Sequence, residues 1–134
     1  MSGQTSVNTL TFSDKIDAAY IYEMYENDYP YIQTIFKAIL DGYDEELAAI
    51  HDNYRKKDLE LLRKSVHKIK PTFGFAGMLM LQEKCREFES TCQAVGSIDE
   101  IEMDFWEWIK HLEEAGAIIK EEHKKLRSFN SSGS

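Results

Sequence analysis

The chain of 134 residues has the size of one domain, and its 43% hydrophobic and 30% charged residues are typical of a globular protein. A formal net charge of −8 argues against non-specific binding to nucleic acid or to an anionic membrane. No apolar stretch reaches the roughly 20 residues of a membrane-spanning helix, the N-terminus does not resemble a signal peptide, and two cysteines in such a chain indicate a reducing, cytoplasmic location.

A short helix and a long helix are predicted in the first 55 residues. The short helix has Ser13 or Asp14 as its N-cap and ends near Asn27. Asp28 is the next N-cap, and Pro30 falls in the first turn, where its missing N–H costs nothing. Apolar residues then recur at steps of three, four and seven, which predicts one amphipathic helix. They are Ile32, Ile35, Phe36, Ile39, Tyr43, Leu47, Ile50 and Tyr54.

Three further segments show helical periodicity. Asp58 is the N-cap of a helix with an apolar stripe over residues 59–73, and a second stripe covers residues 81–95. Ser97 and Glu100 form a capping box ahead of the last helix. Strand signals are scarce, because the sequence has no Asn-Gly hairpin and no sustained alternation of apolar and polar residues.

These elements predict an all-α protein. Four long amphipathic helices with short links favour an antiparallel up-down four-helix bundle, with the short extra N-terminal helix across one end. We expect the bundle to occupy residues 14–128, with flexible tails at residues 1–13 and 129–134.

A basic run surrounds one of the four histidines. Residues 55–70 contain seven lysines and arginines against Asp58 and Glu60, a local net charge of +5 in an acidic chain. His67 lies about 100° around the helix from Val66 of the apolar stripe, and therefore beside the core. Cations and small or ringed residues share its side of the helix: Arg63, Lys64, Lys70, Pro71 and Gly74. A basic setting around an accessible histidine suits a phosphate group.

Two other kinds of site are less well supported by the sequence. Cys85 and Cys92 are seven residues apart on one helical face, about 10 Å between Cα atoms, which is too far for a disulfide and favours core packing. Bundle enzymes with two metal ions use paired Glu-x-x-His motifs, which the sequence lacks. Glu107 and His111 lie one turn apart, a pairing that is common by chance, so no metal site is predicted.

A sequence motif follows His67. The chain reads His67-Lys-Ile-Lys70-Pro71-Thr72-Phe-Gly-Phe-Ala-Gly77-Met, and then Leu81, Cys85 and Phe88-Glu89. This stretch resembles the histidine-containing phosphotransfer (HPt) domain family. The pattern of that family is His-x-x-Lys-Gly, a glycine ten residues after the histidine, and then Leu-x3-Cys-x2-Leu-Glu.

The resemblance implies a role for each matching residue. His67 would accept a phosphoryl group on Nε2, and Lys70 would neutralise that group from one turn away. Glu89 would accept a hydrogen bond from Nδ1–H and so direct the Nε2 lone pair outward. Gly77 would close the end of the helix, and Lys68 has the right charge to contact phosphate.

One residue departs from the family pattern, because Pro71 stands where the family usually has glycine. Proline removes the N–H that would bond the carbonyl of His67, and an interior helix proline costs about 3 kcal/mol and kinks the chain. We therefore expect a bend over residues 67–71, which affects the reach of Lys70. The partner is expected to dock over Lys68, Pro71, Gly74 and Gly77.

The resemblance implies a phosphorelay intermediate of two-component signalling. It would accept a phosphoryl group from a receiver-domain aspartate and pass it to another. Its partners would be response-regulator receiver domains and a hybrid sensor kinase, and the protein would be a monomer. The sequence has no nucleotide-binding loop, so no autonomous kinase activity is expected, and Mg²⁺ would belong to the receiver, with no cofactor here. Two alternatives are an HPt-like module that docks partners without phosphotransfer and a metal-dependent bundle enzyme.

Overall fold

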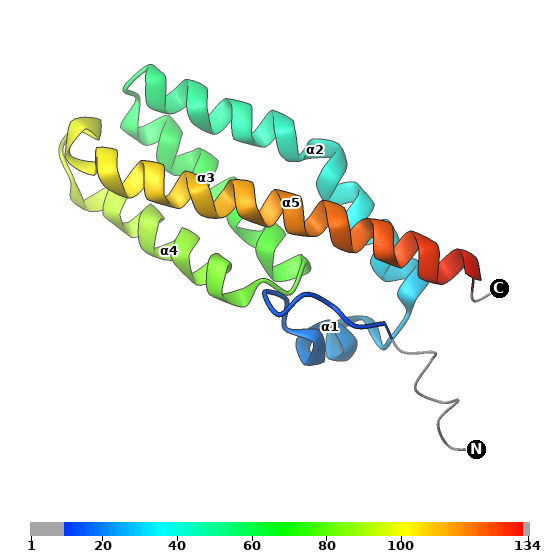
Figure 1. Ribbon diagram of the computed structural model, residues 1–134. Helices are drawn as coiled ribbons and strands as arrows, with labels where there is room; N and C mark the ends of the chain where they lie inside the picture. Colours follow the sequence, from blue (N-terminus) through cyan, green and yellow to red (C-terminus); the bar gives the residue numbers. More distant parts are fainter. Residues whose placement is uncertain (1–9, 133–134) are drawn as a thin grey trace.

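The computed structural model describes residues 10–132, which form helices and contain no β-strand. Four long helices and one short helix are joined by tight links (Figure 1). The all-α bundle predicted from the sequence is therefore confirmed. The elements are α1 (Ala18–Tyr25), α2 (Tyr29–Arg55), α3 (Leu59–Phe75), α4 (Leu79–Ala94), the 3-10 helix η2 (Ile98–Ile101) and α5 (Glu102–Ser132).

The helices begin largely where the capping residues predict. Asp28 accepts from the N–H of Tyr31 at the start of α2, and Asp58 caps α3 in the same way. The prediction for α1 was wrong, because its N-cap is Asp17 rather than Ser13 or Asp14. The Ser97–Glu100 capping box opens η2, and α5 follows without a break.

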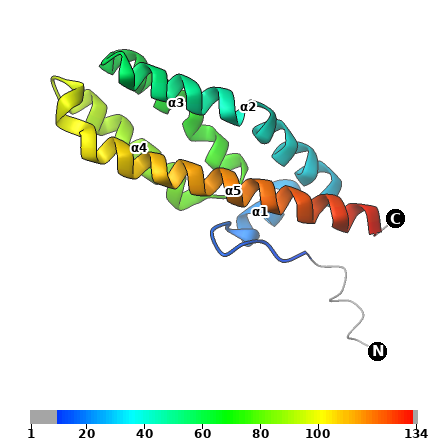
Figure 2. The ribbon, with the colours of Figure 1, turned by 45° about the horizontal axis from the view of Figure 1, so that its top comes forward.

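The bundle is arranged so that each of the four long helices has two neighbours. α3 packs against α4 and α2, and α5 packs against α2 and α4. Figures 1 and 2 show that α2 and α5 extend past the end of α3 and α4, and that α1 lies across this end. No helix among the described residues has the length and apolar character needed to cross a membrane.

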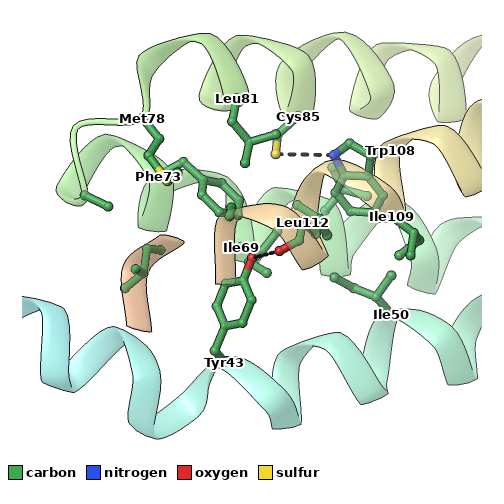
Figure 3. Packing of buried hydrophobic residues seen from close by; sticks show 14 of the residues in the cluster. Tyr43, Ile50, Ile69, Phe73, Met78, Leu81, Cys85, Trp108, Ile109 and Leu112 are labelled. Carbon is green, nitrogen blue, oxygen red and sulfur yellow. Dashed lines mark hydrogen bonds between the residues drawn. The ribbon is translucent and has the colours of Figure 1, made fainter. Parts of the chain in front are cut away.

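Buried side chains from all the long helices meet along the axis of the bundle. Figure 3 shows two polar groups inside this core, each satisfied by a hydrogen bond. The Tyr43 hydroxyl donates to the Leu112 carbonyl at 2.6 Å, and the Trp108 Nε1–H donates to the Cys85 sulfur at 3.4 Å. Both cysteines are free and buried, as core packing predicts, and burial raises the pKa of the Cys85 thiol to about 11.

The expected N-terminal tail is shorter than the sequence predicted. Leu10 and Phe12 are buried in the core, and the Ser13 N–H donates to the buried carboxylate of Glu122 at 3.0 Å. Residues 10–13 are thus packed against α1, α2 and α5, and residues 1–9 lie outside the described residues.

The expected C-terminal tail is also shorter. α5 continues through Ser132 instead of ending at residue 128. Phe129 packs edge-on against Tyr29 with ring centroids 4.8 Å apart, and Asn130 donates to the Tyr29 carbonyl. These contacts with α2 hold the last turns of the helix, while residues 133–134 lie outside the described residues.

Two glycines inside helices have different surroundings, one crowded and one open. Replacing each by alanine therefore tests how closely α2 and α5 pack. A Cβ at Gly116 of α5 would lie 2.8 Å from the Tyr43 ring, whereas a Cβ at Gly42 of α2 would meet nothing within 4 Å. Gly116→Ala should destabilise the protein by about 1–3 kcal/mol through overpacking. Gly42→Ala should stabilise it by up to about 1 kcal/mol through helix propensity. Urea unfolding measures both, and shifts of the same sign would contradict this view of the α2–α5 contact.

Candidate functional site

The site lies on the solvent-facing side of α3. The apolar stripe of α3 is fully buried, and between its members the helix exposes a continuous strip of side chains. This strip consists of Lys64, His67, Lys68, Pro71 and Phe75. The side chain of His67 is 67% exposed, so its ring is open to an approaching molecule.

A buried carboxylate lies behind the exposed imidazole. Glu89 comes from the neighbouring helix α4, and its side chain is only 12% exposed. Its Oε2 lies 2.9 Å from Nδ1 of His67, and its Oε1 accepts a hydrogen bond from Nζ of Lys70 at 2.8 Å. One carboxylate from α4 therefore holds two side chains that are one turn apart on α3.

The electrostatics of the site keep Glu89 ionised. Burial raises the pKa of Glu89, but the hydrogen bonds and charges of Lys70 and His67 outweigh burial, so the pKa lies below its usual value. An ionised carboxylate can only accept hydrogen bonds, so Nδ1 of His67 must carry the proton. In the neutral ring this leaves the lone pair on Nε2, the nitrogen that faces away from Glu89.

A further cation borders this pair. Nη1 of Arg63 lies 3.8 Å from Oε2 of Glu89, while Nη2 and Nε of Arg63 bond the exposed Glu60 at 2.7 and 3.2 Å. The helical spacing predicted that Arg63 lies on the same side of α3 as His67, but it assigned Arg63 no function. Its second partner, Glu89, is 26 positions away in the chain, so helical spacing could not reveal the contact.

Lys70 is therefore not free in this structure. α3 continues as one helix through Pro71 to Phe75, and the bend that the sequence predicted over residues 67–71 stays a prediction. Lys70 extends back to Glu89 instead of into solvent, and its side chain is 24% exposed.

The four residues expected to form the docking surface separate into two groups. Lys68 and Pro71 are exposed next to His67, but Gly74 and Gly77 are buried, so neither glycine offers a surface to a partner. The amide of Gln82 covers Gly74, and Ile21 and Ile16 cover Gly77, whose φ of 74° suits the turn after α3.

The other histidines lie in different surroundings. The ring of His51 packs against Phe105 and Trp106, and Nε2 of His123 is buried without a hydrogen-bond partner among residues 10–132. Burial lowers the pKa of His123. Within residues 10–132, no group of three or more His, Cys, Asp or Glu residues is placed to hold a metal ion.

Removing Lys70 tests the electrostatic account of Glu89. Lys70→Met should raise the pKa of Glu89, because burial still opposes ionisation while a cationic hydrogen bond is lost. The stability that the ionised Glu89 contributes is present above its unfolded-state pKa and is lost as the pH falls through its folded-state pKa. In the variant, this loss should therefore begin at a higher pH.

A carbon-13 NMR titration of the Glu89 carboxyl measures the change. Lys64→Met is the control, because Lys64 is an exposed cation on the same helix. If both variants leave the pKa of Glu89 at the wild-type value, Lys70 does not stabilise the ionised carboxylate.

Comparisons with known proteins relate the chain to one family. The family model of the Hpt domain matches residues 35–120, which is more than half of the chain. In structure, the chain is similar to the crystal structure of the HPT domain from the Hpt sensor hybrid histidine kinase from Shewanella, with a TM-score of 0.71 and 16% sequence identity. That match covers 83% of this chain and 95% of that chain. A comparison with the sequences of curated proteins finds no match. On the family match, the chain belongs to the Hpt domain family.

Proposed function

We propose that this protein is a phosphorelay intermediate that accepts a phosphoryl group on His67 from a receiver-domain aspartate and passes it to another receiver. The observation that carries the proposal is an exposed imidazole held through Nδ1 by a buried carboxylate, with Nε2 facing outward. Membership of the Hpt domain family supports a histidine phosphotransfer role in two-component signalling.

The chemistry asks little of the protein beyond this geometry. The Nε2 lone pair attacks the phosphorus of an aspartyl phosphate, the N–P bond forms, and the bond from phosphorus to the aspartate oxygen breaks. The aspartate carboxylate leaves with the electron pair. Because the proton stays on Nδ1, the ring gains positive charge as it reacts, and the Glu89 carboxylate, 2.9 Å away, stabilises that charge. Lys70 would neutralise the arriving phosphoryl group.

The docking surface that we propose is the exposed strip of α3. Its exposed residues around His67 are the two cations Lys64 and Lys68 and the apolar Pro71 and Phe75. Phe75 is 52% exposed. Cations favour the approach of an anionic aspartyl phosphate, and an exposed aromatic residue provides apolar area for contact.

The partners proposed for this surface are receiver domains of response regulators and of a hybrid sensor kinase. The Mg²⁺ that phosphoryl transfer uses would come bound to the receiver, and the protein would act as a cytoplasmic monomer. The two buried cysteine thiols are consistent with a reducing compartment.

The assignment of His67 has a direct test. His67→Gln should leave the fold intact, since the side chain is largely exposed, and should abolish labelling by a phosphorylated receiver. The label on the wild-type protein should be acid-labile and stable to alkali, as expected for a phosphoramidate bond. Full labelling of the variant would move the site to His51, His111 or His123. A wild-type protein that binds receivers but takes up no label would favour the docking-module alternative.

The docking surface is tested by Phe75→Ala. Phe75 is already about half buried, so burying the rest of its side chain is worth about 0.8–1.5 kcal/mol, and transfer from a phosphorylated receiver should slow about three- to tenfold. Labelling by phosphoramidate, a small donor that needs no docking, should not change. Met103→Ala is the control, because Met103 is 86% exposed at the start of α5 and lies outside this strip. Equal rates for both variants would place the receiver elsewhere.

A further inference from the structure

The carboxylate of Glu89 has one cation bound to it and a second cation close by. Lys70 donates to Oε1 at 2.8 Å, whereas Nη1 of Arg63 lies 3.8 Å from Oε2, beyond hydrogen-bonding distance. Arg63 is bound instead to Glu60, one turn earlier on α3. The two cations are thus unequally engaged in the resting protein.

The proposed function places two demands on Lys70 that it cannot meet at once. Its ammonium is needed at the phosphoryl group on Nε2 of His67, yet it now lies on Glu89, on the Nδ1 side of the ring. When Lys70 leaves, Glu89 loses a charge-assisted hydrogen bond at a position where its side chain is only 12% exposed in this structure. A carboxylate that is largely buried and short of partners is costly, and this cost opposes the movement of Lys70.

Arg63 is placed to relieve this cost. Its side chain is 23% exposed, but the side chain of its present partner Glu60 is 61% exposed, so the Arg63–Glu60 pair contributes little and is easily exchanged. Guanidinium has five N–H donors in a planar fork, so Arg63 can bond Glu89 through Nη1 while keeping a bond to Glu60. Closing the gap to hydrogen-bonding distance requires a shift of roughly 1 Å.

We propose that Arg63 is a positioning residue that takes over the Glu89 carboxylate when Lys70 moves to the phosphoryl group on His67. The inference rests on the proposed function, because it describes the phosphorylated state of the same site. Arg63 does not touch the phosphoryl group in this scheme. It keeps Glu89 ionised and directed at Nδ1 of His67, and so holds the positively charged phosphohistidine ring in place.

The chain contains a matched control for this role. Arg86 pairs with Glu83 on α4 with the same spacing of three residues, and both side chains are about half exposed. No hydrogen bond or ion pair between Arg86 and Glu89 occurs among the described residues. If Arg63 were only a surface partner of Glu60, Arg63→Gln and Arg86→Gln would behave alike.

The experiment uses the full chain and phosphoramidate as donor, so that docking does not enter the measurement. Arg63→Gln should be labelled about fivefold more slowly than wild type and should lose its phosphoryl group several-fold faster. This effect is smaller than that of a fully buried ion pair, because Arg63 is partly exposed. Arg86→Gln should match wild type, and this variant controls for the loss of a positive charge on the helix that carries Glu89. Arg63→Lys should restore part of the rate.

Nitrogen-15 NMR of the arginine side chains adds a readout that a structural role would not affect. Phosphorylation should shift the Nε–H resonance of Arg63 as it changes partners, and leave that of Arg86 in place. A labelled wild-type protein with an unmoved Arg63 signal, or an Arg63→Gln variant with wild-type rates, would overturn the inference alone. A wild-type protein that takes up no label on His67 would instead overturn the proposed function and the inference with it.

Discussion

The site depends on the burial of one carboxylate. Glu89 is placed in the interface between α3 and α4, where water cannot compensate its charge, so it must be satisfied by side chains of the facing helix. α3 meets this need with residues 63, 67 and 70, which an α-helix brings to one side because they are spaced by four and three. The same interaction that makes a buried charge tolerable also fixes the tautomer of His67.

The relative position of α3 and α4 is in turn set at the end of the bundle. The turn between them contains Gly77, whose carbonyl accepts from the N–H of Asp17 at 2.8 Å. Ile16 and Ile21 press against this glycine so closely that a side chain there would collide with them. The N-terminal segment and α1 therefore clamp the turn, and the turn sets the register in which Glu89 faces His67. A substitution at Gly77 would thus disturb the site without touching it.

How far the sequence predicted this structure depends on the range of each interaction. The helices and their N-caps Asp28 and Asp58 were predicted correctly, because a helical stripe or a cap depends on residues that are close together in the sequence. The packing of Leu10 and Phe12 was missed, since two apolar residues are too few to show a period. The burial of Gly74 was missed because it depends on Gln82 of the next helix. The motif pointed to Glu89, but only the folded structure reveals that Lys70 is already bound to it.

The charge balance of the unphosphorylated site explains why two cations beside Glu89 support phosphotransfer better than one. Glu60 and Glu89 are balanced by Arg63 and Lys70, so the unphosphorylated site is close to neutral apart from the exposed lysines 64 and 68. Transfer adds a phosphoryl group with nearly two negative charges and turns the ring into a cation. With Lys70 alone, neutralising that group would strip Glu89 of its partner and weaken the support of the ring at the moment when its charge matters most. A second cation at 3.8 Å allows both demands to be met, at the expense of an exposed ion pair that contributes little to stability.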